Sequence, residues 1–516
     1  MSETVSGRPA SAIWAYRLGG LAIAALVYAL LGSADMSGDA RVVAAIATLM
    51  AVWWMTEAVP LSATSLLPII LVPALTERTV SETTASYANP IVFLFLGGFL
   101  IAIAMEKWGL HRRIALFTLS KVGVSPRRIV LGMMLATGFL SMWVSNTATT
   151  LMMLPIGFSV LALVSGRAMS GGGAGPSATQ DAAVAGDGAN PEIDNFAICL
   201  VLAIAWSASM GGLGTLLGSP PNAIIAGYAS DELGVEIGFV DWMILGVPLA
   251  FTFIAIGWVL MTRVLYRFDI DEIPGGKQLI SGEIAKMGSM SQGEKMVALV
   301  FSGAAFLWIV PGLLSEFPAI SAAAPWLGGF DDAAIAIAAG LALFLLPGRD
   351  NNVMVLDWKD AETGLPWGVL LLFGGGLSLA GAVAGTGLDD WFGQQVTGLA
   401  TLPAVLLIAA VVTIVLFLTE VTSNTATAAT FIPVLGGVAM GVGVDPMGLL
   451  IPAALAATCA FMLPVGTPPN AIAFSTGVVT IGQMARGGLV LNLVGIALIT
   501  GFVYWLGGMA LGLQLG

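Results

Sequence analysis

Long apolar runs follow one another along almost the whole length of this chain, and they constrain its fold more than any other feature. Eleven of these runs have about 17 to 25 residues, the length that crosses a bilayer as a helix. They lie near residues 15–33, 40–56, 61–77, 89–108, 196–216, 242–266, 296–313, 331–347, 366–388, 447–464 and 487–513. Two further runs, 127–164 and 400–440, are too long for one crossing and carry polar residues in the middle. The chain is therefore predicted to be an all-α polytopic membrane protein.

The composition excludes several classes of function. Charged residues make up 10% of the chain, against about 25% in ordinary soluble domains. The net charge of −12 leaves no basic face for a nucleic acid. One His and two Cys leave no zinc, haem or disulfide framework. An intramembrane enzyme needs a metal or an acid–base pair at depth, and an ATP-driven pump needs a phosphate loop. The sequence offers neither, so we expect a protein that is not an enzyme, and a channel remains an alternative.

The distribution of Lys and Arg predicts the orientation in the membrane. With eleven helices and a cytoplasmic N-terminus, 17 of the 19 basic residues fall inside, and only Arg41 and Arg78 fall outside. This count requires that run 127–164 starts and ends inside and that run 400–440 starts and ends outside. Both runs are then predicted to be re-entrant helical hairpins that enter from opposite faces. The expected location is the inner (plasma) membrane, with the first apolar run retained as a helix.

The two halves of the chain repeat each other. The sequence SNTAT at 145–149 recurs at 423–427, an offset of 278 residues, and PPNAI at 220–224 recurs at 468–472, an offset of 248. The difference of 30 residues corresponds to segment 166–195, which is rich in Gly, Ala, Ser and Asp and is predicted to be a disordered cytoplasmic linker. Because the charge count places the copies in opposite orientations, this is an inverted repeat, as is typical of secondary transporters.

The repeat predicts the domain organisation. Residues 1–39 hold the N-terminal segment and first helix, 40–266 the first copy, 267–295 a cytoplasmic linker, and 296–516 the second copy. Within the first copy, the basic amphipathic stretch 107–128 is expected to lie along the cytoplasmic surface as an arm.

Each copy contains two polar breaks in apolar sequence. One is the SNT at the centre of the hairpin, and the other is a Gly-(Ser/Thr)-Pro-Pro-Asn run that begins at Gly218 or Gly466. Consecutive prolines remove amide donors and stop a helix. Unwound backbone at membrane depth is tolerated only where it is buried in protein or lines a cavity. Its carbonyls, with Ser, Asn and Thr oxygens, suit sodium, and helix N-termini favour an anion. One break alone would be an ordinary cap or kink. Four related breaks together predict a site that binds both sodium and an anion.

At these residues the chain closely resembles the divalent anion/sodium symporter family, which transports di- and tricarboxylates and, in some members, sulfate. The resemblance includes WWMTEAVP at 53–60, LPWGVLLLFGGG at 365–376, both SNT motifs and both Pro-Pro-Asn breaks. It runs from about residue 15 to the C-terminus, apart from segment 166–195. The resemblance implies a homodimeric, sodium-coupled symporter that imports C4-dicarboxylates such as succinate, malate and fumarate by an elevator-type motion. Citrate, sulfate or another small anion, proton coupling and exchange remain alternatives.

The resemblance also implies the site residues. The first sodium site would comprise Ser141, Ser145, Asn146 and the carbonyl of Gly218. Its symmetry mate would comprise Thr419, Thr422 through its carbonyl, Asn424 and Gly466. Substrate carboxylates would meet residues of both hairpins and of the second Pro-Pro break: Ser145, Asn146, Thr147, Ser423, Asn424, Thr425, Thr467 and Pro468. Ser141 and Thr419 keep a hydroxyl at both sodium sites, which favours sodium coupling over exchange.

Three ionisable residues stand apart from these motifs. Acids in or beside apolar spans are costly and often functional. Glu420 adjoins the second SNT and is expected either to tune the sodium site or to act as a capped carboxylate, whereas Glu57 precedes a Pro-terminated turn and is expected to be structural. His111 lies among basic residues and is expected to be solvated. No Lys or Arg lies near a break, so neutral donors, helix ends and sodium itself would recognise the anion, and no organic cofactor is expected.

Overall fold

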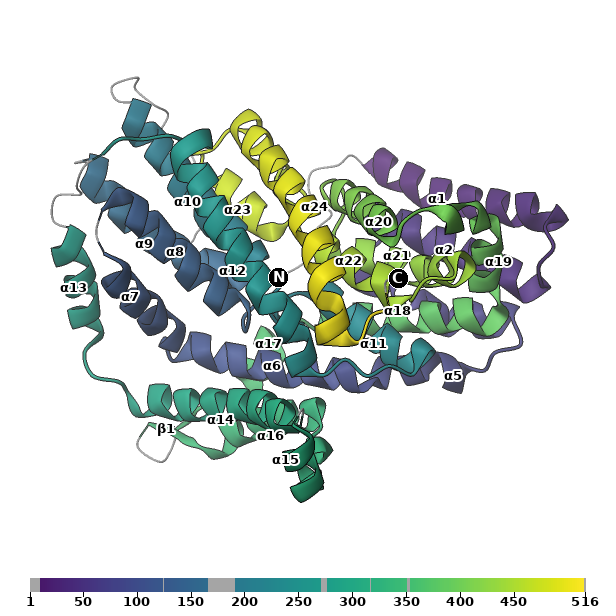
Figure 1. The fold of residues 1–516 in the computed structure, drawn as a ribbon, viewed down its shortest axis with the longest axis horizontal. Coiled ribbons are helices and arrows are strands. Elements are labelled where there is room, and N and C mark those ends of the chain that lie inside the picture. The colour runs from purple at the N-terminus through teal and green to yellow at the C-terminus, as the bar shows by residue number, and fades with distance from the viewer. Residues whose placement is uncertain are drawn as a thin grey trace.

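The protein is almost entirely helical, as Figure 1 shows for the computed structural model. The structure describes residues 10–123, 125–165, 191–270, 276–315, 317–349 and 353–514. In this part of the chain the only sheet is a two-stranded antiparallel ribbon. Among the described residues, ten helices are long and apolar enough to cross a membrane. The prediction of an all-α polytopic membrane protein is therefore confirmed.

The helices of the first half follow the predicted apolar runs. They are α1 (Ala10–Leu30), α2 (Gly38–Thr56), α3 (Leu61–Thr64), α4 (Leu67–Leu75), α5 (Val80–Ala85), α6 (Pro90–Lys107), α7 (Leu110–Val122), α8 (Pro126–Ser141), α9 (Asn146–Ser165), α10 (Pro191–Gly211), α11 (Pro220–Leu233) and α12 (Phe239–Leu260). Short 3₁₀ turns cover Leu31–Ser33, Ser86–Ala88 and Leu216–Gly218, and a π-turn, Met261–Leu265, extends α12.

The second half has a similar succession of elements. They are α13 (Gly276–Met287), α14 (Gln292–Ser315), α15 (Pro318–Ala323), α16 (Asp332–Leu345), β1 (Pro347–Arg349), β2 (Val353–Met354), α17 (Trp358–Gly364), α18 (Trp367–Thr386), α19 (Leu388–Gln395), α20 (Ala404–Thr419), α21 (Asn424–Val442), α22 (Met447–Thr458), α23 (Pro468–Ser475) and α24 (Ile481–Leu511). Two 3₁₀ turns cover Pro325–Gly329 and Thr397–Thr401.

Three of the eleven predicted spans are not single long helices. Run 61–77 is divided into α3 and α4, and Pro68 lies in the first turn of α4, where the missing amide of a proline costs nothing. Run 331–347 forms the 14-residue α16. Run 447–464 forms the 12-residue α22 and then unwinds ahead of the second Pro-Pro pair. The remaining two of the ten long apolar helices are α9 and α21, the second arms of the predicted hairpins.

The internal repeat recurs in the helix boundaries. The helices α8 and α20 end at Ser141 and Thr419, and α9 and α21 begin at Asn146 and Asn424. Four residues therefore interrupt each long apolar run, and the two helices of each pair pack against each other. Likewise, α11 and α23 both begin at the first proline of their Pro-Pro pair. We name the unwound residues 212–219 the first break and 459–467 the second break.

Residues 191–195 differ from the prediction. They were assigned to the linker, but the structure places them in the first turn of α10. Proline is favoured at the first position of a helix because its fixed φ suits the turn, and Glu192 and Asp194 complement the positive end of the helix dipole. Residues 166–190 of the predicted linker lie outside the described residues.

Packing brings the two repeats together around α24. Figure 1 shows α24 passing between α12 and the pair α20 and α22, and it contacts all three. On one side α8, α9 and α10 pack together, and on another α14 and α16 pack with α6. Close approach of helices depends on small residues: a Cβ atom on Gly211 of α10 would overlap the carbonyl of Gly138 in α8.

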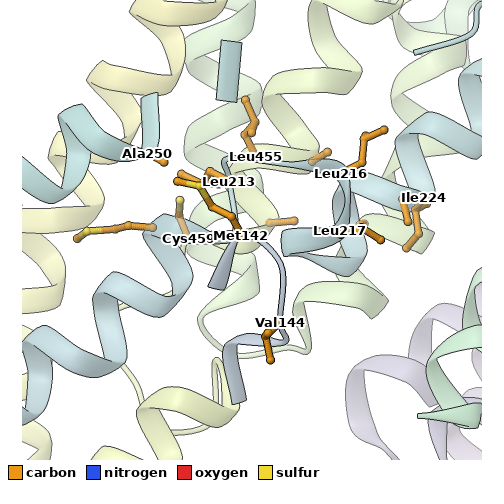
Figure 2. Close-up of a cluster of buried hydrophobic side chains, with 14 of the residues drawn as sticks. Met142, Val144, Leu213, Leu216, Leu217, Ile224, Ala250, Leu455 and Cys459 are labelled. Atoms are coloured by element: carbon orange, nitrogen blue, oxygen red, sulfur yellow. The ribbon is translucent and has the colours of Figure 1, made fainter. Parts of the chain in front are cut away.

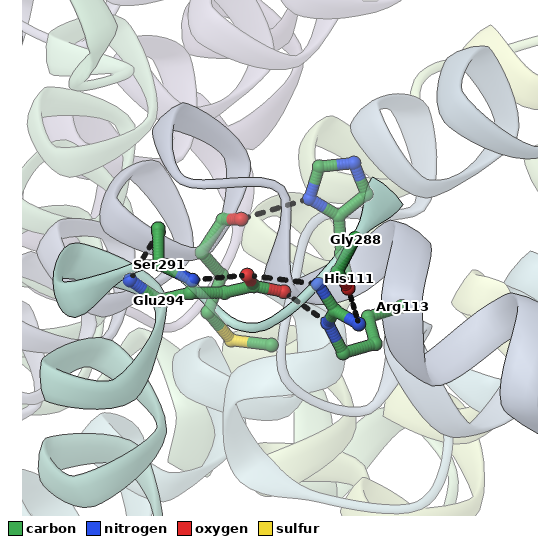
Figure 3. Close-up of polar contacts among 6 residues, drawn as sticks. His111, Arg113, Gly288, Ser291 and Glu294 are labelled. Carbon is green, nitrogen blue, oxygen red and sulfur yellow. Dashed lines mark hydrogen bonds and ion pairs between the residues drawn. The ribbon is translucent and has the colours of Figure 1, made fainter. Parts of the chain in front are cut away.

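Ion pairs fasten α7 to segments that the sequence also assigns to the cytoplasmic side. Arg113 donates from Nε and Nη2 to the two carboxylate oxygens of the buried Glu294, at 2.5 and 3.1 Å, as Figure 3 shows. Arg112 pairs with Glu283 of α13 at 2.6 Å. His111 is not simply solvated, contrary to expectation: it is half-buried, its Nδ1 lies 2.8 Å from the carbonyl of Met105, and burial lowers its pKa. The predicted arm is thus a helix fixed at several points.

Candidate functional site

Four oxygens converge where the first hairpin meets the first break. The side-chain amide oxygen of Asn146 lies 2.5 Å from Ser141 Oγ, which donates to it. Two main-chain carbonyl oxygens face the same amide atom, that of Ala208 at 3.1 Å and that of Gly218 at 3.2 Å. Three of these groups are acceptors only. Acceptors that face one another are stabilised by a cation bound among them, or by rotation of the Asn146 amide so that its NH2 group donates to the two carbonyls. We name these four groups the first oxygen cluster.

The second hairpin and second break build the same arrangement. Thr419 Oγ1 donates to Asn424 Oδ1 at 2.7 Å and also lies 2.9 Å from the carbonyl of Ala457. The same amide atom of Asn424 lies 3.0 Å from the carbonyl oxygen of Ala457 and 3.2 Å from that of Gly466. This second oxygen cluster therefore also combines one hydroxyl, one amide and two carbonyls. Several neutral oxygens on unwound backbone and helix ends are the ligands that transporters offer to sodium.

The asparagine of each Pro-Pro-Asn run holds the unwound backbone in place. Asn222 Nδ2 donates to the carbonyls of Gly212 at 2.9 Å and Thr215 at 2.8 Å. In the second copy, Asn470 Nδ2 donates to the carbonyls of Ala460 at 3.0 Å and Leu463 at 3.1 Å. Both asparagines are fully buried. Each break is therefore a defined structure, because carbonyls that lack helical partners are satisfied by a side chain in the first turn of the next helix.

Different hydrogen bonds join the hairpins to the breaks in the two copies. We name the residues between the paired helices, 142–145 and 420–423, the hairpin tips. In the first copy, Thr215 Oγ1 of the break donates to the carbonyl of Met142 in the tip. In the second copy, the symmetry mate of Met142 is Glu420, whose carboxylate accepts hydrogen bonds from three successive amides of the break. The donors to Glu420 are Phe461 at 2.7 Å, Met462 at 2.9 and 3.0 Å, Leu463 at 3.1 Å, and also Asn492 Nδ2 at 2.8 Å.

These contacts bear on both expectations for Glu420. The side chain is buried and fully hydrogen-bonded, and it fixes the loop that carries Gly466, a member of the second oxygen cluster. Glu420 is thus a capped carboxylate that also positions the second oxygen cluster. Glu57, by contrast, is the left-handed C-cap of α2, with φ 51°, and lies in no described site contact, in line with a structural role.

The structure brings most of the predicted sodium ligands together. Ser141, Asn146 and Gly218 share the first oxygen cluster, and their symmetry mates share the second. The hydroxyl of Ser145 instead accepts from the amide of Ala148 at 3.3 Å, as a helix cap. The hydroxyl of Thr422 donates to the carbonyl of Leu418 at 2.9 Å and lies 2.6 Å from the hydroxyl of Thr427. For all of these residues, Ser145 and the carbonyl of Thr422 included, sodium binding stays a prediction.

Sequence reasoning missed the carbonyls of Ala208 and Ala457. Every residue has a carbonyl, so no sequence signal marks the one that points into a site. The sequence also did not reveal that Asn222 and Asn470 donate to the break carbonyls, although the asparagine recurs in both Pro-Pro-Asn motifs.

The predicted substrate residues differ in their exposure. Pro468 is exposed, whereas Thr467 is buried and its Oγ1 accepts from the amide of Asn470 at 3.3 Å. The helix α23 packs against α9, the helix that begins at Asn146 of the first SNT motif. The side chains of both SNT motifs are partly or fully exposed: Ser145, Asn146, Thr147, Ser423, Asn424 and Thr425. The helices α9 and α21 begin at these two motifs, and a helix N-terminus favours an anion.

The chain matches the sequence pattern of a family described as the sodium:sulfate symporter transmembrane region, over residues 11–512. Two similar proteins are both named sodium-dependent dicarboxylate transporter SdcS. One, from Staphylococcus saprophyticus subsp. saprophyticus, is 42% identical over 483 residues, which is 93% of this chain and 88% of the relative. The other, from Staphylococcus aureus strain USA300, is 41% identical over 484 residues, with the same coverage.

Solved structures of two membrane transporters have a similar fold. The Alcanivorax borkumensis YdaH transporter matches 96% of this chain and 97% of its own length, with a TM-score of 0.55 and 14% identity. Neisseria gonorrhoeae MtrF matches 97% of this chain and 96% of its own length, with a TM-score of 0.54 and 12% identity. At these identities the likeness concerns the fold alone.

Proposed function

Because this chain belongs to the sodium:sulfate symporter family and resembles sodium-dependent dicarboxylate transporters along 93% of its length, we propose that it is a sodium-coupled secondary transporter that imports C4-dicarboxylates such as succinate, malate and fumarate. The observation that carries this proposal is the pair of oxygen clusters, built alike at the two polar breaks of the repeat. Two such sites suit two sodium ions, and the exposed helix N-termini beside them suit an anion.

Each sodium ion would be held by neutral oxygens. The first site would use Ser141, Ser145, Asn146 and Gly218, to which the structure adds the carbonyl of Ala208. The second would use Thr419, Thr422, Asn424 and Gly466, with the carbonyl of Ala457. Because these ligands carry no formal charge, a bound sodium ion leaves a positive charge close to the SNT side chains.

That positive charge explains how the anion would be recognised without Lys or Arg. The carboxylates would accept hydrogen bonds from the SNT side chains, from Thr467 and from the first amides of α9 and α21. Sodium would therefore bind first and raise the affinity for the substrate, and transport of the anion alone would be weak. Two sodium ions with a dianion move no net charge, whereas a third ion would make transport sensitive to voltage by about 2.3 kcal/mol per 100 mV.

We further propose the arrangement that the family resemblance implies. The protein would lie in the inner (plasma) membrane with a cytoplasmic N-terminus, and α8–α9 and α20–α21 would be re-entrant hairpins that enter from opposite faces. The hairpins and the helices with breaks would move as a transport domain against the remaining helices, which would form a homodimer. The first copy would span 40–266, the linker 267–295, and the second copy 296–516.

Sulfate is the second candidate substrate, because the family description itself names it. Citrate and exchange without sodium are weaker candidates. The dicarboxylate is preferred because the two relatives that share 41–42% identity with this chain are named for it.

Uptake of radiolabelled succinate into proteoliposomes tests the proposal. We expect uptake with an inward sodium gradient and little with potassium or a proton gradient, and we expect Asn146→Ala and Asn424→Ala to abolish it. Asn195→Ala is the matched control, because that half-buried asparagine near the start of α10 lies outside both oxygen clusters and, within the described residues, donates to the carbonyl of Arg267. Sodium-independent uptake, or full activity in both site variants, would refute the mechanism. Competition by unlabelled malate, fumarate, citrate and sulfate ranks the substrates.

A further inference from the structure

One buried hydrogen bond joins the two copies of the repeat between their breaks. Ser219, the N-cap of α11, and Thr458, the last residue of α22, place their hydroxyl oxygens 2.9 Å apart. Both residues are completely buried. The Thr458 hydroxyl also lies 3.4 Å from the carbonyl of Ala454, so it donates there while it accepts from Ser219.

This bond has no counterpart in the repeat. The symmetry mate of Ser219 is Thr467, whose hydroxyl caps its own helix by accepting from the amide of Asn470 at 3.3 Å. The symmetry mate of Thr458 is Met210, which has no hydroxyl. Ser219 makes no such cap in α11. A break can therefore form without this bond, and the Ser219 hydroxyl is used across the repeat instead of within it.

The bond connects the two oxygen clusters by a short path. Ser219 directly follows Gly218, whose carbonyl belongs to the first oxygen cluster, and Thr458 directly follows Ala457, whose carbonyl belongs to the second. One peptide bond on each side, the side chains of Ser219 and Thr458, and one hydrogen bond separate the two carbonyls. A shift of one carbonyl toward an ion therefore displaces the hydroxyl next to it, and the partner hydroxyl lies beside the other carbonyl.

Tight packing around this path limits other responses. Figure 2 shows side chains of the first break, of the first hairpin tip and of α22 together in one buried cluster, which includes Met142, Leu213, Leu455 and Cys459. All four are buried, and α11 packs directly on α22. Because close-packed interiors do not absorb shifts smoothly, a movement at one break is passed on through this contact.

We propose that the Ser219–Thr458 hydrogen bond couples the two sodium sites, so that the ion that binds first orders the carbonyl that the second ion needs. This inference rests on the proposed function, because it takes the oxygen clusters as sodium sites. Both residues act as positioning residues and touch neither ion. The first ion bears the cost of ordering the shared path, the second ion finds it ordered, and sodium binding becomes cooperative.

The size of the effect follows from the bond. One neutral hydrogen bond changes an equilibrium constant by about two- to twelvefold. In equilibrium binding to two sites of equal affinity, a tenfold coupling gives a Hill coefficient of about 1.5, and no coupling gives a coefficient of about 1. Unequal affinities lower both values, and uptake that needs both ions is sigmoidal even without coupling, so the change between variants is what reports the coupling. Loss of the bond should therefore lower the Hill coefficient for sodium by about 0.2 to 0.5.

The test is a sodium titration of succinate uptake, together with equilibrium binding of radioactive sodium to the purified protein. Thr458→Val keeps the volume but removes the hydroxyl, and it should lower the Hill coefficient in both assays, as should Ser219→Ala. The double variant should lower it no further than either single one. Thr458→Ser keeps the hydroxyl and should restore the coefficient. Thr137→Val, at a fully buried hydroxyl of α8 that has no partner among the described residues, is the matched control and should leave it unchanged.

The outcomes separate this inference from the proposed function. An unchanged coefficient in Thr458→Val, or an additive double variant, overturns the coupling while sodium-driven uptake stands. A higher half-saturating sodium concentration at an unchanged coefficient shows ordinary structural damage, and it also overturns the coupling. Uptake that needs no sodium in the wild type refutes the proposed function itself.

Discussion

Replacing Glu420 by glutamine tests how the second break is held in place. The carboxylate accepts from the amides of Phe461 and Met462 through Oε1 and from those of Met462 and Leu463 through Oε2. Glutamine has one acceptor oxygen and one NH2 group. If its oxygen takes the place of Oε1, the NH2 group meets the N–H of Leu463, donor against donor. The opposite orientation is worse, because Phe461 and Asn492 then lose their acceptor.

At least one buried amide is therefore left without a partner in Glu420→Gln. An unsatisfied buried donor costs about 1–3 kcal/mol, which corresponds to a factor of about 5 to 150 in an equilibrium constant. The loop that loses this bond leads directly to Gly466, whose amide also bonds to the carbonyl of Leu463 at 3.2 Å. We expect the sodium concentration for half-maximal succinate uptake to rise at least about fivefold.

The assay is sodium-dependent uptake in proteoliposomes, with the stabilising effect of sodium on the thermal unfolding of the detergent-solubilised protein as a second readout. Met142→Leu is the matched control at the symmetry-related position, since Thr215 bonds there to the main-chain carbonyl and a swap of similar volume costs little. If Glu420→Gln keeps both the wild-type sodium dependence and the wild-type stabilisation by sodium, the carboxylate does not position the second oxygen cluster.

Three further substitutions probe separate parts of the structure. Thr215→Val removes the hydroxyl that bonds the first break to the carbonyl of Met142, at a cost of about 1–2 kcal/mol; a sodium titration should show a several-fold weaker response, and an unchanged titration would show that this link is dispensable. Gly211→Ala forces α10 away from Gly138, so size-exclusion chromatography after heating should show a lower midpoint of unfolding. Glu294→Gln breaks the two-fold ion pair that holds α7 and should lower that midpoint through the loss of about 1–3 kcal/mol; because Glu294 is buried, the loss should persist at high salt.

The fold could be predicted from the sequence where local signals were strong. Apolar runs identified the long helices, and the offset of 278 residues predicted that α20 and α21 would end and begin where α8 and α9 do. The division of run 61–77 into α3 and α4 was not predicted, because hydropathy does not mark the residue at which one helix ends and the next begins. The helical start of α10 was missed because a Gly-rich segment precedes it and masks the proline and acids that favour a helix N-terminus.

The candidate site could be predicted only as far as side chains define it. Hydroxyls and amides in a doubled motif marked Ser141, Asn146, Thr419 and Asn424, and the structure brings each pair together. Main-chain carbonyls carry no sequence signal, so those of the alanines in α10 and α22 were found only from the geometry. The position of Glu420 beside the SNT motif left two roles open, because its partners lie about 40 and 70 residues later in the chain.

The two copies are alike where they would bind ions and unlike where they contact their surroundings. Each cluster consists of one hydroxyl, one side-chain amide and two main-chain carbonyls. Yet the tip of the first hairpin places Trp143 in a buried stack with Phe239 and Trp308, whereas its symmetry mate Val421 is exposed. Only the second copy has a carboxylate at the tip, in the form of Glu420. A negative charge beside one cluster and not the other makes their affinities for a cation unequal. Sodium binding is therefore expected to be ordered, with the second oxygen cluster filled first.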